Sequence, residues 1–365
     1  MLRDGIRFML GDMTQTFNER VVSAGEQVAQ SPLDFNPTIM AMLQALSDNV
    51  IMPLAGLILT FLLTYELISL IMQRNNMGDV DYGLFVKWGI KLVVGVFFLA
   101  NTFTIVNGIF AIGGNVIQAA AGTGGGGIGP EGNALLNLLP WVVNAVGVLI
   151  GFFGLASLGI GISQDSSAEK HKGVMAIVGG ILVLGAGLLI GQVASMWVTG
   201  SVGGLDTSAS LELDMGTLDT VLDVMATGQL LTLLMASTIV WLVMLGVGVV
   251  VPIIILQRFI EIYLYISLAA LPMATFVNGE IGGIGKNYLK TLAAYTFQGL
   301  LIIILFHIFG ALVDAQLNGM MTELATEGTA EGLVGSLFLM AGFSVLLVVA
   351  MFRAGSAAKS IFGVS

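Results

Sequence analysis

The chain has 365 residues, and its composition is typical of a protein that crosses a membrane several times. Hydrophobic residues make up 56% of the sequence and charged residues only 10%, with a formal net charge of −10, whereas soluble domains carry roughly 25% charged residues. Because there is no cysteine, disulfide bonds and thiol catalysis are excluded. Long apolar runs predict an all-α, polytopic bundle of transmembrane helices, since a barrel would show alternating segments of about ten residues.

Residues 1–46 are predicted to form amphipathic helices. Between Ile6 and Val28 an apolar residue recurs every three or four positions, and charged residues take the other face. Such a helix lies on a membrane or on a partner. Pro32 and Pro37 end it. The segment has no uninterrupted apolar core, so it is not typical of a cleaved signal peptide.

Seven later stretches are apolar and long enough to cross a membrane. The second of them is expected to continue or bend near Asn101, Asn107 and the Gly113–Gly114 pair. The stretches are residues 50–73, 84–105, 134–162, 174–199, 230–256, 292–313 and 333–352.

Changes in composition divide the chain into five segments. The sequence GTGGGGIGPEGN is a flexible linker by composition, and the loop before residue 228 carries five carboxylates without a lysine or arginine. The segments are the N-terminal helices on the extracellular side (1–46), a first helix pair (47–121), the linker with a helical hairpin (122–205), an acidic extracellular loop (206–227) and a C-terminal core (228–365).

Each arm of the predicted hairpin carries a GxxxG motif. Small residues four apart let helix backbones approach closely in lipid, so close packing within the hairpin or between copies is expected. The alternative is that glycine is simply common in membrane helices. The motif residues are Gly147, Gly151, Gly187 and Gly191.

The distribution of lysine and arginine predicts the orientation, because both favour cytoplasmic loops. Residues 122–133, 200–227 and 314–332 contain neither. A full crossing by Phe259–Val277 would place Lys286 outside, whereas a segment that dips in and returns keeps every basic loop inside. The prediction is therefore seven spans, with the N-terminus outside and the C-terminus in the cytoplasm.

A broken or re-entrant segment is accordingly expected between Arg258 and Asn278. Pro272 supports a break in the helix, and irregular backbone at membrane depth is buried in protein or lines a watery cavity. Arg258 and Glu261 are three residues apart on one helical face, which predicts a local ion pair.

Glu66, Lys91 and His307 are ionisable residues in the interior of predicted spans. Glu66 and Lys91 are expected at similar depth in antiparallel helices, which predicts a structural ion pair, with a role in conduction as the alternative. For His307, a hydrogen bond within the bundle competes with a role as a proton relay. The sequence has no HExxH, GxSxG, paired-aspartate or P-loop pattern, so no enzyme activity, cofactor or metal site is predicted.

With these residues in place, the chain resembles the TrbL-type polytopic channel components of type IV secretion systems, in the form found in conjugative elements of Gram-positive bacteria. The resemblance implies a cytoplasmic-membrane subunit of a channel that passes DNA and relaxase, together with dedicated ATPases, a coupling protein and other channel subunits. It also implies an outside N-terminus and an inside C-terminus. It is carried by LSDNVIMPLAG (46–56), TYELISLI (64–71), RNNMGDVD (74–81), RFIEIYL (258–264), LPMATFVNGEIGGIGKNYLK (271–290) and GSAAKSIF (355–362).

Residues 124–203 depart from this resemblance and look like an insertion. Two glycine-rich helices joined by a short charged loop are similar to the pilin subunits of type IV secretion systems, which suggests a natural fusion. Repeated around a homo-oligomeric ring, the hairpin would line a pore; otherwise it would only fill lipid-facing space. Lys170 and Lys172 would then form a basic collar at the cytoplasmic mouth, or would simply anchor the loop inside.

The leading hypothesis is a structural and conduit subunit of a DNA transfer channel. Its partners would be membrane lipids, other copies of itself, other secretion subunits and the translocating DNA, with no small-molecule substrate. A secondary transporter is the main alternative, because transporters also build sites from broken helices, although the other half of the chain shows no inverted repeat of the broken segment. Another oligomeric pore-forming membrane protein is the third hypothesis.

Overall fold

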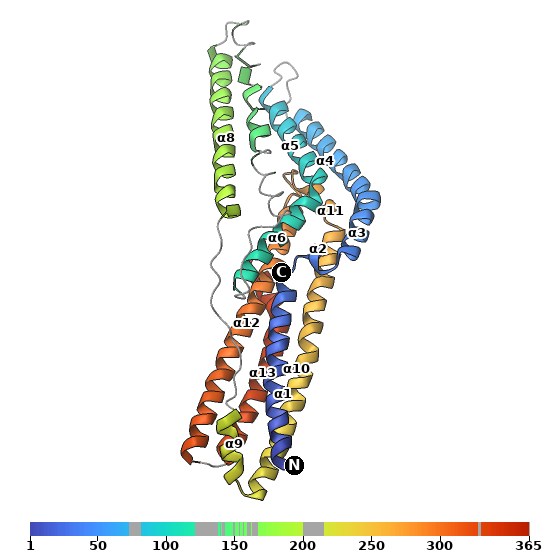
Figure 1. Cartoon of the computed structure of the whole chain (residues 1–365). Helices are drawn as coiled ribbons and strands as arrows, with labels where there is room; N and C mark the ends of the chain where they lie inside the picture. The colour runs from blue at the N-terminus through green and yellow to red at the C-terminus, as the bar shows by residue number, and fades with distance from the viewer. Residues whose placement is uncertain are drawn as a thin grey trace.

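Almost every described residue lies in a helix, and the described part of the chain contains no strand. The computed structural model describes residues 1–72, 82–120, 167–199, 215–327 and 330–364, and between them 138, 140, 143–148, 150–152, 154–155, 157–158 and 162. The all-α prediction is confirmed. The helices form an elongated molecule with one group toward each end (Figure 1).

Three long helices make up the larger group. α10 (Thr227–Ser267) and α12 (Gly283–Glu327) are antiparallel, and α13 (Ala330–Ile361) packs against both. Their inner faces belong to one continuous apolar core that contains the fully buried Ile255 and Ile302. In lipid, side-chain packing of this kind holds helices together, because lipid tails are as apolar as the side chains themselves.

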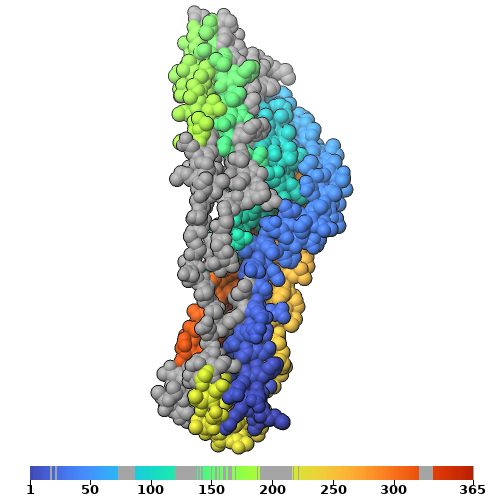
Figure 2. Space-filling view, in the orientation of Figure 1, coloured from blue at the N-terminus to red at the C-terminus, as the bar shows by residue number. Residues whose placement is uncertain are grey.

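α1 (Leu2–Ala29) lies along α10 and packs on it. The recurring apolar residues Ile6, Leu10 and Val28 are buried in the same core as the long helices. α1 also forms part of the surface in the lower half of the molecule (Figure 2). One face of α1 is therefore closed by the bundle, and the opposite face is open.

A sharp corner follows α1. α2 (Pro32–Phe35) is capped by Ser31, whose Oγ accepts a hydrogen bond from the Asp34 N–H at 3.2 Å. α3 (Pro37–Leu46) is capped by Asn36, whose Oδ1 accepts one from the Ile39 N–H at 3.0 Å. Such caps satisfy N–H groups that have no partner in the first turn, and proline suits the first helical position.

The smaller group of helices lies beyond the ends of α10 and α12 (Figure 1). A π-helical turn, η1 (Ser47–Ile51), leads into α4 (Met52–Met72), which packs against α5 (Tyr82–Ala100). α6 (Thr102–Ala120) then returns to the bundle, because the chain bends by 66° at Asn101. The bend lies at one of the three places where it was expected.

The Gly113–Gly114 pair lies inside α6 and serves close packing there instead of a bend. A Cβ atom on Gly113 would lie 1.6 Å from Cγ2 of Thr296 in α12, and one on Gly114 would lie 2.7 Å from the backbone oxygen of Ala29. Both distances are shorter than atoms tolerate. The two glycines therefore allow α6 to contact α12 and the end of α1.

Four described helices are long and apolar enough to cross a membrane, or five if α5 and α6 count as one bent span. The four are Pro37–Met72, Thr227–Ser267, Gly283–Gly319 and Gly332–Ile361. The predicted number of seven spans is not reached among the described residues, and residues 134–162, the first arm of the hairpin, are described only in part.

The break predicted between Arg258 and Asn278 begins later than expected. α10 continues without interruption through Arg258 to Ser267, where the chain leaves the helix. Pro272 lies in the short helix α11 (Ala270–Thr275), which packs against α4, α5 and α12. The irregular backbone is thus buried in protein, as such segments need to be at membrane depth.

Candidate functional site

The end of α1 leaves a carbonyl without its usual helical partner. In a continuing helix the Val28 oxygen would accept the N–H of the fourth residue onward, but that residue is Pro32, which has none. Arg258 fills this position: its Nη1 donates to the Val28 oxygen at 3.0 Å. The negative end of the α1 dipole also favours a cation there.

Two further residues of the RFIEIYL segment hold the same corner. The Phe259 ring stacks on Phe35, with centroids 3.8 Å apart and planes 9° from parallel. The Tyr263 hydroxyl donates to the Pro32 oxygen at 2.7 Å in a buried position. We call Arg258, Phe259 and Tyr263 the corner clamp, because together they fix the α1–α2 corner to α10.

α12 completes the surroundings of the buried guanidinium. Arg258 is only 3% exposed, and its Nη2 donates to the Tyr295 oxygen at 3.3 Å. A Cβ atom on Gly299 would lie 2.7 Å from that Nη2 and 2.6 Å from Cδ1 of Ile117. The absence of a side chain at residue 299 therefore makes the space for the arginine.

The predicted Arg258–Glu261 ion pair is not formed. Arg258 points to the carbonyls of α1 and α12, and Glu261 accepts a hydrogen bond from Gln257 Nε2 at 3.1 Å. A cation buried in an apolar bundle needs hydrogen-bond partners, and the carbonyl left by Pro32 supplies one to Arg258.

Asn278 shapes the turn that leads into α12. It is 8% exposed, and its Oδ1 accepts the N–H groups of Glu280 at 2.9 Å and Ile281 at 3.0 Å. A Cβ atom on Gly285 would lie 2.7 Å from the Pro272 oxygen. The NGEIGGIG sequence thus lets the turn fold back tightly onto α11.

Glu66 of α4 and Lys91 of α5 form an ion pair between Lys91 Nζ and Glu66 Oε1. The side chains are 16% and 37% exposed, respectively. The structure therefore brings Glu66 and Lys91 together as a pair between α4 and α5. Pairing in this position lowers the cost of holding either charge among apolar helices.

Ion pairs also join α1 to α9 at the opposite end of the molecule. Arg3 Nη1 lies 3.1 Å from Asp223 Oδ1, and Arg7 pairs with Asp219. Both carboxylates belong to α9 (Met215–Val224), inside the predicted acidic loop. By themselves, Arg3 and Arg7 would favour a cytoplasmic N-terminus. Each of them is matched by an acidic residue of α9.

The arms of the hairpin approach closely through glycines, only some of which belong to the predicted motifs. A Cβ atom on Gly147 would lie 3.0 Å from the Gly180 oxygen, and one on Gly154 would lie 2.9 Å from the Gly173 oxygen. Gly151 borders the first of these contacts. Gly187 and Gly191 lie in α8 (Ser167–Thr199), but their surroundings are outside the described part.

Other ionisable residues have local roles. The Nδ1 atom of His307 lies 2.9 Å from the Ile303 oxygen one turn earlier in α12, a hydrogen bond within the bundle. Lys170 and Lys172 lie in the first turns of α8, at the loop side of the hairpin. No group of three metal-ligating side chains occurs among the residues that the structure describes.

The long apolar helices and their polar clamp define a multi-pass helical membrane protein. The model of the TrbL/VirB6 plasmid conjugal transfer like protein family matches residues 17–139 and 188–270, which is more than half of the chain. The chain belongs to this family, which is a family of conjugal transfer components and not a known enzyme class. No curated protein and no solved structure matches the chain.

The family match contains the corner clamp and the residues that the clamp holds. Val28, Pro32 and Phe35 fall in the first matched part, and Arg258 to Tyr263 fall in the second. The carbonyl left by Pro32 is the signal in the sequence that could have located the clamp. Nothing in the sequence indicates which of the chain's arginines satisfies it.

Proposed function

We propose that the chain is a structural and conduit subunit of a type IV secretion channel in the cytoplasmic membrane, where it aids the transfer of DNA and attached protein. The family match carries this proposal. The apolar helices fit a subunit that forms a passage, with other secretion subunits and ATPases as partners.

The proposed orientation has the N-terminus outside and the C-terminus in the cytoplasm. The ion pairs from Arg3 and Arg7 to α9 support it, because they hold the N-terminus beside the acidic segment. Lys286 and Glu323 lie at opposite ends of α12, which agrees with a basic cytoplasmic side and an acidic outer side.

The proposed assembly is a homo-oligomeric ring with seven spans per subunit, two of them supplied by an inserted pilin-like hairpin. The family match omits residues 140–187, which lie within the segment read as an insertion, and this omission supports a fusion. Close contact between glycines of the two arms gives the hairpin a narrow profile that suits repetition around a ring. Lys170 and Lys172 would repeat at each subunit as a basic collar.

Conjugation frequency tests the proposed function. A donor strain without this chain should lose DNA transfer, and the wild-type chain supplied in trans should restore it. Undiminished transfer by the deletion strain would reject the proposal. The collar has its own test: Lys170→Glu with Lys172→Glu should lower transfer at normal membrane levels of the protein, whereas the same exchange at Lys286 and Lys290 serves as the control.

A further inference from the structure

α1 and α10 lie parallel and in register along the whole length of α1. Contacts of α10 with α1 and with Pro32, just after α1, pair residues whose numbers differ by 228, 229, 230 and 231, in order from the N-terminus. Because this offset changes by only three, the two helices advance together in the same direction. The pairs are Met9 with Ser237, Asp12 with Trp241, Val28 with Arg258, and Pro32 with Tyr263.

Most of the part of α10 beside α1 carries no charge, and Arg258 at its end is the exception. From Thr227 to Gln257 every residue is uncharged, a stretch about 45 Å long at 1.5 Å per residue, whereas a hydrocarbon core is about 30 Å thick. Leu242 and Val249, near the middle of this stretch, are 57% and 61% exposed on the outer face of α10. Exposed apolar side chains on this face suit contact with lipid, so this part of α10 lies at membrane depth. Because α1 packs along it, the middle of α1 lies at the same depth.

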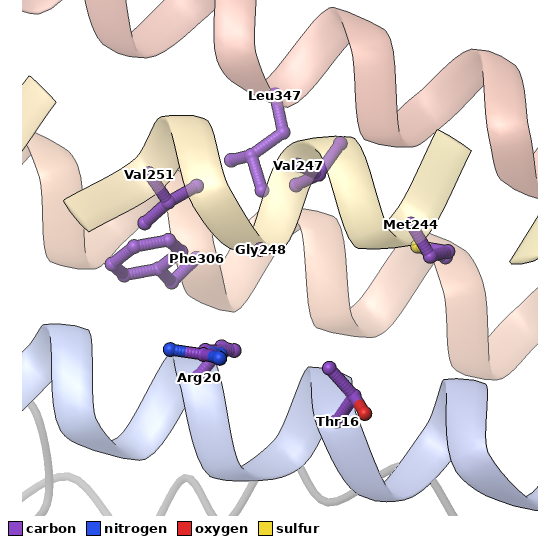
Figure 3. A pocket seen from close by; sticks show the side chains of 8 residues that line it. All are labelled: Thr16, Arg20, Met244, Val247, Gly248, Val251, Phe306 and Leu347. Atoms are coloured by element: carbon purple, nitrogen blue, oxygen red, sulfur yellow. The ribbon is translucent and has the colours of Figure 1, made fainter. Parts of the chain in front are cut away.

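Polar groups of α1 are accommodated on its inner side. Asp12 Oδ2 accepts a hydrogen bond from Trp241 Nε1 at 2.8 Å. A cavity of about 20 Å³ lies between α1, α10, α12 and α13, with Thr16 and Arg20 on one side (Figure 3). Its lining includes Gly248. The Gly248 carbonyl has no helical N–H partner, because the residue four positions later is Pro252, which has no N–H. The cavity has room for one water molecule.

The outer face of α1 is charged at the same level. Gln15 and Glu19 are exposed, and Gln15 donates to Glu19 at 2.9 Å. We call these two residues the α1 polar stripe. Ionisable groups at membrane depth are costly against lipid and face a bundle interior or a water-filled cavity, so the stripe does not fit a lipid-facing surface.

We infer that α1 crosses the membrane beside α10, and that the α1 polar stripe faces a water-filled conduit enclosed by copies of this chain. Termini on opposite sides of the membrane require an odd number of crossings, so α1 takes the place of one of the seven proposed spans. α1 is too polar for a hydropathy criterion to find, yet α10 holds it at depth. The inference of a conduit rests on the proposed function, whereas the depth of α1 rests on its contacts with α10.

Single cysteines test the inference in intact cells that carry the assembled channel, and the wild-type chain is the blank because it has no cysteine. Gln15→Cys and Glu19→Cys probe the stripe, with Leu242→Cys and Val249→Cys as controls at the same level on the lipid face. A membrane-impermeant, charged thiosulfonate reagent should modify the stripe positions at least about tenfold faster, because the reactive thiolate needs water.

Two results would overturn the inference. Equal rapid modification of all four positions would mean that this level of the bundle lies outside the membrane. No modification of either stripe position in the assembled channel would mean that protein or lipid covers the stripe. Val224→Cys, 83% exposed beyond the start of α10, shows that the reagent is active.

Transfer assays separate this inference from the proposed function. After modification, the Glu19→Cys strain should transfer DNA at least about tenfold less than before, and the Val249→Cys strain should be unchanged. If either of the two contradicting labelling results is found and the deletion strain still loses DNA transfer, the α1 conduit is rejected and the proposed function is kept.

Discussion

Replacement of Gly299 by alanine should destabilise the bundle through the corner clamp. The added Cβ would lie 2.7 Å from Arg258 Nη2 and 2.6 Å from Ile117 Cδ1, so the guanidinium has to move away from the Tyr295 oxygen. Overpacking costs about 1–3 kcal/mol, and a buried donor without a partner costs about the same. We therefore expect the free energy of unfolding to fall by about 2–5 kcal/mol.

Denaturant titration of the purified protein in detergent measures this change, with Gly246→Ala as the matched control. Gly246 lies in α10 with no atom close to its added Cβ, so alanine there should be neutral or stabilising by up to about 1 kcal/mol through helix propensity. Equal stabilities of the two variants would refute the reasoning. The loss should shrink when Arg258→Met is already present, because contacting residues are energetically coupled.

Two other contacts give smaller expected effects. Tyr263→Phe removes the buried hydrogen bond to the Pro32 oxygen and should lower the free energy of unfolding by about 1–3 kcal/mol. The control is Tyr65→Phe, which should change the free energy of unfolding little because Tyr65 is 49% exposed. Similar losses at both sites would contradict the clamp. Glu66→Gln leaves Lys91 without its partner, so it should lower the level of the folded protein in the membrane, and Glu66→Gln with Lys91→Gln should restore it; a double variant no better than the single one would show that the pair is dispensable.

Sequence reasoning predicted a contact or a bend correctly where the residues involved lie close together in the chain, or where their depth in neighbouring spans follows from counting residues. Glu66 and Lys91 each lie in the interior of neighbouring spans, so antiparallel packing of α4 and α5 brings them together. The bend at Asn101 lies at one of the places where a single long apolar stretch has to be interrupted.

Sequence reasoning failed where a distant segment offers a better partner. The three-residue spacing of Arg258 and Glu261 predicts a pair, but Pro32, far away in the sequence, leaves a carbonyl that attracts the arginine instead. α10 also stays helical past Arg258, so the break begins at Ser267. The close approach of α6 to α12 at Gly113 also depends on a tertiary neighbour, Thr296.

The position of α1 shows a second limit of pattern reading. Its spacing of apolar residues indicates one buried face but not the identity of the surface that covers it. In the structure this surface is α10, a largely apolar helix of the same chain. A polar helix held at the depth of an apolar one is visible only when both are placed in three dimensions.

The mass of the complex solubilised in mild detergent tests the central claim of a ring-forming conduit subunit most directly. Native mass spectrometry of the wild-type chain should show one dominant species that contains several copies, and charge reversal in the hairpin loop should leave that number unchanged. A monomer as the dominant species under conditions that preserve the rest of the channel would contradict the claim, because a single chain has no shared central passage.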